Sequence, residues 1–174
     1  MSYFKFLVMA LIIVGCETNN KELSINEIEH EKKNIQLILD TWHRNAAEAN
    51  FENYFKTFAS ESVFIGTDAS ENWTVQEFKE FSKPYFESGK AWNFKPLQRT
   101  VFVNANGKSA WFDELLNTWM GICRGSGVLV FEDRQWKLKH YVLSITIPND
   151  NVSKIVTINK PKDSLFLRKI LKEN

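Results

Sequence analysis

Residues 110–150 constrain the fold more than any other part of the chain, because they carry the pattern of three consecutive antiparallel strands. Along residues 110–117 the side chains alternate between two faces, which is typical of a strand. Asp113 and Glu114 therefore point to opposite sides of that strand, and both faces are largely apolar. We expect the rest of the chain to fold around this sheet.

Two further strands are predicted in the same region, at residues 124–132 and 136–147. The short polar segment 133–135 joins them and suits a hairpin. Glycine inside a strand pattern marks a bulge, a sharp curve or the close approach of another group, and this region contains Gly121, Gly125 and Gly127. The sequence therefore predicts a sheet that curves around something.

Another hairpin is predicted upstream, where residues 94–104 have the composition of a strand. Asn106 and Gly107 follow, and both tolerate the positive φ that a type I′ turn requires. This is the strongest turn signal in the chain. It pairs the upstream strand with residues 110–117.

Two capping boxes mark the starts of predicted helices, because a Ser or Thr is followed three residues later by a Glu. Ser24 with Glu27 opens a helix that extends to about residue 49, with a buried stripe formed by Ile28, Ile35, Leu39, Trp42 and Ala46. Thr74 with Glu77 opens a second helix, whose aromatic face contains Phe78, Phe81, Tyr85 and Phe86. Pro84 is expected to kink or divide that helix, because it lacks an amide donor.

The overall composition indicates one globular domain with small extensions, since 44% of 174 residues are hydrophobic. The 22 Lys and Arg residues are balanced by 21 Asp and Glu residues. A surface for nucleic acid or for an anionic membrane needs concentrated positive charge. We therefore expect no nucleic-acid partner.

The N-terminal segment resembles a bacterial lipoprotein signal. Residues 1–15 form a short apolar leader, too short to span a bilayer, and Gly15 precedes Cys16 as in a lipobox. Acylation of Cys16 would tether the protein to the cell envelope through the polar residues 16–23, although an ordinary signal peptide or an uncleaved anchor would share this pattern. Cys123 would then have no partner for an intramolecular disulfide.

The remaining chain divides into a domain at residues 24–150 and an extension at residues 151–174. Within the extension, residues 152–158 favour an edge strand and residues 164–172 favour a basic amphipathic helix. The extension could cover the domain, contact a partner or fray.

Several short motifs occur together and in a fixed order along residues 28–150. They are Trp42–His43, GTDA at 66–69, Glu71, Trp73, Glu77–Phe78, WFDE at 111–114, CRGSGVL at 123–129, Trp136–Lys137 and IPND at 147–150. In this order they resemble the SnoaL-like family, a branch of the superfamily of nuclear transport factor two and ketosteroid isomerase. The resemblance implies an α+β fold, in which a strongly curved, mostly antiparallel sheet and N-terminal helices form a cone around a pocket (a cystatin-like α+β roll).

No complete catalytic signature is present in the sequence. The three histidines lack a metal-ligand spacing, and no nucleophile elbow or dinucleotide fingerprint occurs. We therefore expect neither a metal nor a cofactor. Asp68 and Glu71, in the loop before Trp73, are interpreted as turn or cap residues, or as groups at the mouth of the pocket.

Candidate bases for proton-transfer chemistry are Asp113, His43 and Glu114, since burial in an apolar cavity raises the pKa of a carboxylate. Asp113 is favoured, because it shares a strand face with Trp111. A structural ion pair between one of these carboxylates and Arg124 is the alternative. The expected pocket contains Trp42, His43, Phe55, Trp73, Phe86, Trp111, Asp113, Trp119, Arg124 and Tyr141.

Three functions are compatible with these residues. The first is a membrane-tethered domain that binds a small, largely apolar ligand without established catalysis. The second is an enzyme of the isomerase, cyclase or hydrolase-like kind, with a pocket carboxylate or histidine as general base. The third is a protein-interaction module in the envelope. Homodimerisation is expected from the family resemblance and from the apolar residues on both faces of the sheet.

Overall fold

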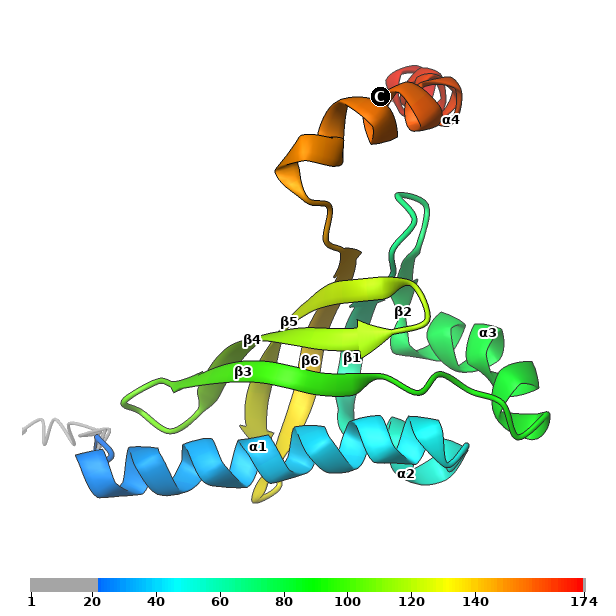
Figure 1. The fold of residues 1–174 in the computed structure, drawn as a ribbon. Helices are drawn as coiled ribbons and strands as arrows, with labels where there is room; N and C mark the ends of the chain where they lie inside the picture. The colour runs from blue at the N-terminus through cyan, green and yellow to red at the C-terminus, as the bar shows by residue number, and fades with distance from the viewer. Residues whose placement is uncertain (1–21, 174) are drawn as a thin grey trace, which may run out of the picture.

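The computed structural model describes residues 22–173, so the predicted signal peptide and the lipidation site Cys16 lie outside the described residues. Within this range the chain forms a six-stranded sheet and four α-helices (Figure 1). In chain order these are α1 (Ile25–Ala47), α2 (Phe51–Lys56), β1 (Phe58–Ile65), β2 (Asn72–Thr74), α3 (Val75–Glu87), β3 (Lys95–Val103), β4 (Ser109–Thr118), β5 (Gly121–Glu132), β6 (Gln135–Ile145) and α4 (Val152–Glu173), with a short 3-10 turn, η1 (Asn149–Asn151), before α4.

The sheet has the strand order β2-β1-β6-β5-β4-β3. Strands β3 to β6 form an antiparallel meander, as the sequence predicts. Strand β1 adds in parallel to β6, and β2 pairs with β1 in antiparallel fashion. The predicted α+β class, with a mostly antiparallel sheet, is confirmed.

Helix α1 lies along one face of the sheet (Figure 1), where its apolar stripe is buried. Ile35, Leu39, Trp42 and Ala46 are at most 1% exposed and belong to the core. The capping box at its start is complete, because the amide of Glu27 donates to Ser24 Oγ (3.3 Å) and the amide of Ser24 donates to Glu27 Oε2 (2.7 Å). The second predicted capping box, Thr74 with Glu77, is present in the same form.

Close contacts explain two of the glycines in the curved strand β5. A Cβ on Gly125 would collide with the phenol of Tyr141 and crowd the Glu114 side chain, and one on Gly127 would collide with the Phe112 ring. Side chains from neighbouring strands, together with the backbone carbonyl of His140 beside Gly127, occupy these spaces instead. The predicted close approach at these glycines is confirmed.

The predicted hairpin at residues 133–135 is present, whereas the turn at Asn106 and Gly107 differs from the predicted type I′ turn. The type I′ signature occurs at Asp133 and Arg134, which have φ of 50° and 62° and join β5 directly to β6. At the predicted site only Gly107 has a positive φ (65°), because the connection spans residues 104–108. Side chains stabilise this longer loop, where Asn106 Oδ1 accepts a hydrogen bond from the amide of Lys108 at 2.9 Å.

Helix α3 is not divided at Pro84, although Pro84 lies inside it. Phe78 and Phe86, on either side of the proline, are both buried in the core, and this packing holds the two parts in one element. Residues 152–158 form the start of α4 rather than the predicted edge strand. Since β6 already lies between β1 and β5, the chain that leaves it has no free sheet edge beside it.

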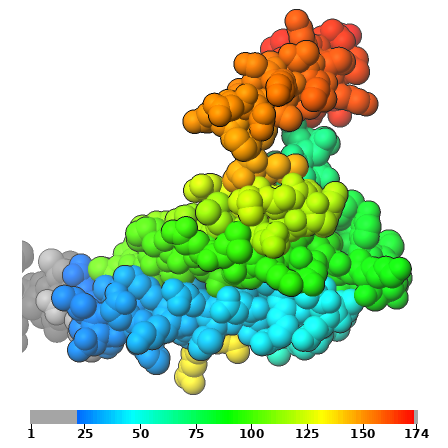
Figure 2. Space-filling view, in the orientation of Figure 1, coloured from blue at the N-terminus to red at the C-terminus, as the bar shows by residue number. Residues whose placement is uncertain are grey.

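Helix α4 stands away from the body of the domain and is joined to it by a narrow connection (Figure 2). The predicted amphipathic helix at residues 164–172 is part of this single longer helix. Across residues 22–173, no helix is both long enough and apolar enough to cross a membrane.

Candidate functional site

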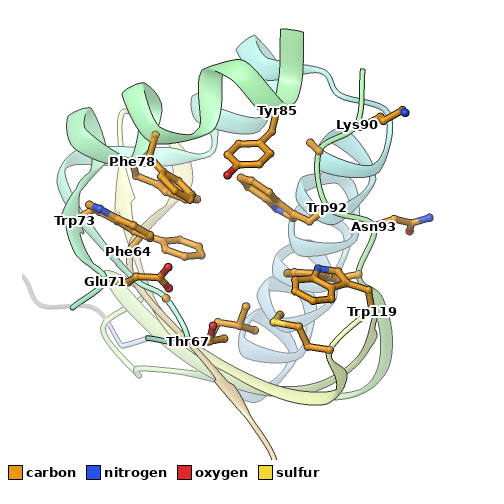
Figure 3. Close-up of a pocket in the computed structure, with 16 residues that line it drawn as sticks. Phe64, Thr67, Glu71, Trp73, Phe78, Tyr85, Lys90, Trp92, Asn93 and Trp119 are labelled. Atoms are coloured by element: carbon orange, nitrogen blue, oxygen red, sulfur yellow. The ribbon is translucent and has the colours of Figure 1, made fainter. Parts of the chain in front are cut away.

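A cavity of about 480 Å³ opens at one end of the sheet, between α3, the β1–β2 loop and the β4–β5 turn (Figure 3). Its walls are mainly aromatic, formed by Trp73, Phe78, Phe81, Tyr85, Trp92 and Trp119. Phe64 and Leu143 contribute buried apolar surface from the sheet. The aromatic residues that pattern analysis assigns to helix α3 therefore form both core and cavity wall.

The aromatic walls are ordered by stacking. Trp73 stacks on Phe81 with ring centroids 4.6 Å apart, and Phe78 stacks on Phe64 at 3.9 Å. Phe78 is 1% exposed, whereas Phe81 is 41% and Trp119 is 83% exposed. The cavity therefore passes from a packed aromatic floor to a wide, apolar mouth.

Polar groups at the cavity come from the β1–β2 loop and from the connection between α3 and β3. Figure 3 shows the Glu71 carboxylate directed into the cavity, whereas the Lys90 side chain points away from it. Glu71 Oε2 accepts a hydrogen bond from the amide of Asp68 at 3.1 Å. Glu71 is thus both the turn residue and the pocket-mouth residue that the sequence allows.

A buried ionic cluster centred on Glu114 lies deeper in the domain. Glu114 is 1% exposed, and its Oε1 accepts a hydrogen bond from the Tyr141 hydroxyl (2.9 Å) and lies 2.9 Å from His43 Nε2. Its Oε2 accepts a hydrogen bond from Arg99 Nε at 2.8 Å, and Arg99 Nη2 lies 2.8 Å from the same carboxylate. Both carboxylate oxygens are therefore engaged.

The cluster joins helix α1 to three strands of the sheet. Arg99 is the direct cross-strand neighbour of Glu114, and Arg99 Nη1 also donates to Asp40 Oδ1 at 2.7 Å. His43 comes from α1 and Tyr141 from β6. The arrangement fixes the position of the helix on the sheet.

Burial raises the pKa of Glu114, but the hydrogen bond and charge of His43, together with Arg99, more than offset it and leave this pKa below its ordinary value. The pKa of Tyr141 is raised well above its ordinary value by burial and by the neighbouring Glu114 carboxylate. Glu114 is therefore stabilised in its charged carboxylate form, and Tyr141 is stabilised in its neutral phenol form. A general base in an apolar pocket has the opposite shift.

Asp113 does not line the cavity, because it lies on the outer face of the sheet with Trp111. Trp111 is 48% exposed and stacks on Phe102, with ring centroids 5.5 Å apart. Arg124 is exposed, faces Leu115 across the β4–β5 pair and does not contact Glu114. The predicted ion pair with Arg124 is thus replaced by one with Arg99, because Arg124 points to the other face of the sheet.

The other residues expected in the pocket divide into two groups. Trp73 and Trp119 line the cavity. Five more are buried in the aromatic and ionic core: Trp42, His43, Phe55, Phe86 and Tyr141. The structure therefore brings two of the expected residues to the cavity and places most of the others behind its wall.

Sequence reasoning missed Arg99, although a signal for it exists. Arg99 lies seven residues before Asn106, and Glu114 lies seven residues after Gly107. Counting outward from the turn pairs these two residues, as the observed register does. A basic and an acidic residue placed symmetrically about a hairpin turn indicate this ion pair.

Within residues 22–173, no group of three or more His, Cys, Asp and Glu side chains is arranged to hold a metal ion. Cys123 is a buried free thiol, and its Sγ lies 3.5 Å from Thr118 Oγ1. It is part of the core rather than of the cavity.

The SnoaL-like domain family matches residues 35–148, and the chain belongs to this family. No curated protein matches the chain by sequence. Solved structures that resemble it are between 11% and 18% identical, so that likeness is one of fold.

Three solved structures illustrate this likeness. An NTF2-like protein of unknown function from Pseudomonas putida KT2440 has a TM-score of 0.60 at 12% identity, covering 71% of this chain and 92% of that one. A proposed dehydratase of the NTF2-like family from Streptomyces avermitilis also has a TM-score of 0.60 at 12% identity, covering 69% and 99%. The association domain of CaMKII from C. elegans has a TM-score of 0.57 at 16% identity, covering 69% and 99%.

Proposed function

We propose that this protein is a membrane-tethered, homodimeric SnoaL-like domain that binds a small, largely apolar ligand in its aromatic cavity. The observation that carries the proposal is the cavity itself, about 480 Å³ in volume and lined mainly by aromatic side chains. Cavities of this size and composition are typical of small-molecule sites. Each 100 Å² of apolar surface that a ligand removes from water contributes about 2.5 kcal/mol to binding before entropic costs.

The exposed rings at the mouth support a binding role. Phe81, Tyr85 and Trp119 are 41%, 47% and 83% exposed, so large apolar surfaces face solvent at one place. The adjacent Phe64 and Phe78 are already buried in the core. Core packing therefore does not explain why the three rings at the mouth are exposed. Contiguous exposed apolar surface of this kind marks binding sites.

Binding is favoured over proton transfer because the buried candidate bases are engaged with one another. His43 and Glu114 lie 2.9 Å apart, and Arg99 and Tyr141 occupy the rest of the carboxylate. Neither His43 nor Glu114 lines the cavity. An isomerase or cyclase mechanism that used either residue would need it free and in contact with the ligand.

The outer face of the sheet supports the proposed homodimer. Phe102, Trp111 and Val128 are consecutive neighbours across β3, β4 and β5, and they are 40%, 48% and 39% exposed. A row of apolar residues across three strands is suited to a symmetric interface, in which the same patch meets its copy. The tether would be a lipid on Cys16, which places the domain at the bacterial cell envelope.

The ligand-binding proposal is tested with the neutral apolar dye N-phenyl-1-naphthylamine and the purified full chain in phosphatidylcholine nanodiscs. Empty nanodiscs give the background from dye that partitions into lipid. We expect saturable fluorescence enhancement, weakened about tenfold by Trp119→Ala, which corresponds to about 1.4 kcal/mol.

Leu171→Ala is the control, because it removes an exposed apolar side chain from α4, away from both the cavity and the proposed dimer face. It should leave the dissociation constant of the dye unchanged. Equal dye affinity in both variants and the parent would contradict binding in the cavity.

A further inference from the structure

We propose that the cavity selects ligands that carry a positively charged ammonium group, which the Glu71 carboxylate binds while aromatic rings contact the apolar remainder. This inference rests on the proposed function, since it names the ligand class of the same cavity. It follows from how Glu71 is placed, from the charges that face the cavity and from the nature of its walls.

The position of Glu71 is built into the β1–β2 loop. The amide of Gly66 donates to the Glu71 carbonyl at 2.9 Å, and the amide of Glu71 donates to the Asp68 carbonyl at 2.9 Å. The side chain folds back over Gly66, where any Cβ would collide with Glu71 Oε2. The absence of a side chain at Gly66 therefore allows the carboxylate to lie against the cavity wall.

The hydrogen bonds of the Glu71 side chain leave half of the carboxylate for a ligand. Oε2 accepts from the amide of Asp68 at 3.1 Å, and this bond holds the group in the loop. Oε1 has no hydrogen-bond donor from the described part of the protein. A primary, secondary or tertiary ammonium group entering the cavity can donate to this oxygen.

The net charge directed into the cavity is negative. Glu71 and Lys90 are the charged residues among those that line it, and Figure 3 shows the first directed inward and the second outward. Apolar walls lower the local dielectric constant and strengthen the field of a single charge. A cation is therefore attracted into the cavity, and an anion is repelled from it.

The walls add a second attraction for a cation. Trp73 comes from the same side of the cavity as Glu71, whereas Trp92 and Trp119 lie on the other side (Figure 3). The faces of indole rings attract ammonium groups, more strongly than those of Tyr or Phe. An aryl-alkyl amine can thus place its charge beside Glu71 and its ring against the tryptophans.

Three probes of nearly equal size test this selection: phenethylammonium, 2-phenylethanol and 3-phenylpropionate. Their dissociation constants are measured by isothermal titration calorimetry on the full chain in phosphatidylcholine nanodiscs at neutral pH, with empty nanodiscs as the blank. We expect phenethylammonium to bind about tenfold more tightly than 2-phenylethanol, and 3-phenylpropionate to bind more weakly than both.

Glu71→Gln tests the carboxylate, because it removes the charge and keeps the shape and an acceptor for the Asp68 amide. It should remove the preference for phenethylammonium and leave the affinity for 2-phenylethanol unchanged. Asp113→Asn is the matched control, since it removes a carboxylate from the outer face of the sheet and should change none of the three affinities.

The outcomes separate this inference from the proposed function. If 2-phenylethanol binds as tightly as phenethylammonium, the charge selection is overturned while the apolar site stands. If Glu71→Gln weakens all three probes equally, Glu71 acts through the shape of the loop, which also overturns the inference. If none of the probes binds, and N-phenyl-1-naphthylamine does not bind either, both proposals fail.

Discussion

Arg99 and Glu114 face each other across the β3–β4 hairpin, and Arg99 Nε donates to Glu114 Oε2 at 2.8 Å. Both side chains are almost fully shielded from solvent, with exposures of 6% and 0%. A buried ion pair contributes little to net stability relative to apolar residues, but the loss of one partner leaves an uncompensated charge. The pair therefore makes correct docking of α1 and the sheet depend on both residues.

Glu114→Ala should lower the free energy of unfolding by about 3–5 kcal/mol, because it leaves the Arg99 guanidinium buried without its carboxylate. Urea denaturation followed by circular dichroism measures this change. Asp113→Ala, one residue away on the outer face, should change it by only about 0.5 kcal/mol or less. Similar losses in the two variants would contradict a structural role for the buried cluster.

Stability should fall in acid through the Glu114 carboxylate. Its pKa in the folded protein lies below the ordinary value of 4.5, so the unfolded chain takes up a proton first as the pH falls. The stabilisation is complete above pH 4.5 and is lost as the pH falls through the folded pKa. Urea midpoints measured from pH 7 to pH 2 should show a shallower acid loss in Glu114→Gln, and an unchanged slope in that variant would exclude this carboxylate as a source.

Gly125→Ala should destabilise the domain by about 1–3 kcal/mol, because a methyl group there collides with the buried Tyr141 and Glu114 side chains. Thermal unfolding by calorimetry measures the effect. Ser126→Ala is the control, since the neighbouring Ser126 is exposed on the other face of the same strand. Equal melting temperatures for Gly125→Ala and the parent would contradict this prediction, because they would show that the neighbouring side chains can move aside for the methyl group.

Trp111→Glu should convert the proposed homodimer into monomers, because it places a charge at the centre of the apolar row on the outer face. Sedimentation velocity at micromolar concentration distinguishes the two states. Leu171→Glu provides a control, as Leu171 is 76% exposed on α4 and lies away from the sheet. A parent protein that sediments as a monomer would refute the proposed dimer.

Lipidation of Cys16 predicts that cells fed a labelled fatty acid incorporate the label into this protein. The label should disappear in Cys16→Ser and persist in Cys123→Ser, because Cys123 is buried in the folded domain. Undiminished labelling of Cys16→Ser would refute the assignment.

The period of apolar residues and the capping boxes were sufficient to predict the antiparallel meander and both capped helices, because these features depend on residues that are close in sequence. The parallel pairing of β1 with β6 was not predictable in this way, since Phe64 and Tyr141 meet only through the folded core. Residues 152–158 were mispredicted as a strand because their Val and Ile residues favour strands, while the absence of a free edge beside β6 is a property of the whole sheet.

The candidate site was less predictable than the fold. The alternation of Asp113 and Glu114 shows that they face opposite sides, but it does not say which side the helices cover. The sequence allows Glu71 to be a pocket residue, yet its orientation depends on its contact with Gly66 inside the loop. Side-chain direction in a loop is set by contacts that have no period in the sequence.

The parallel pairing of β1 with β6 also has a consequence for how the chain acquires its structure. Strand β1 ends at Ile65, and its partner β6 begins only at Gln135, so about half of the domain lies between these two strands and nearly all of the domain must be synthesised before they can pair. Long-range pairing of this kind slows folding, because the entropy cost of closing the loop comes before the stabilising contacts form. The aromatic segments of α2, β1 and α3 therefore stay without their sheet until late in synthesis, and any chaperone that shields this chain would have to act before β6 is complete.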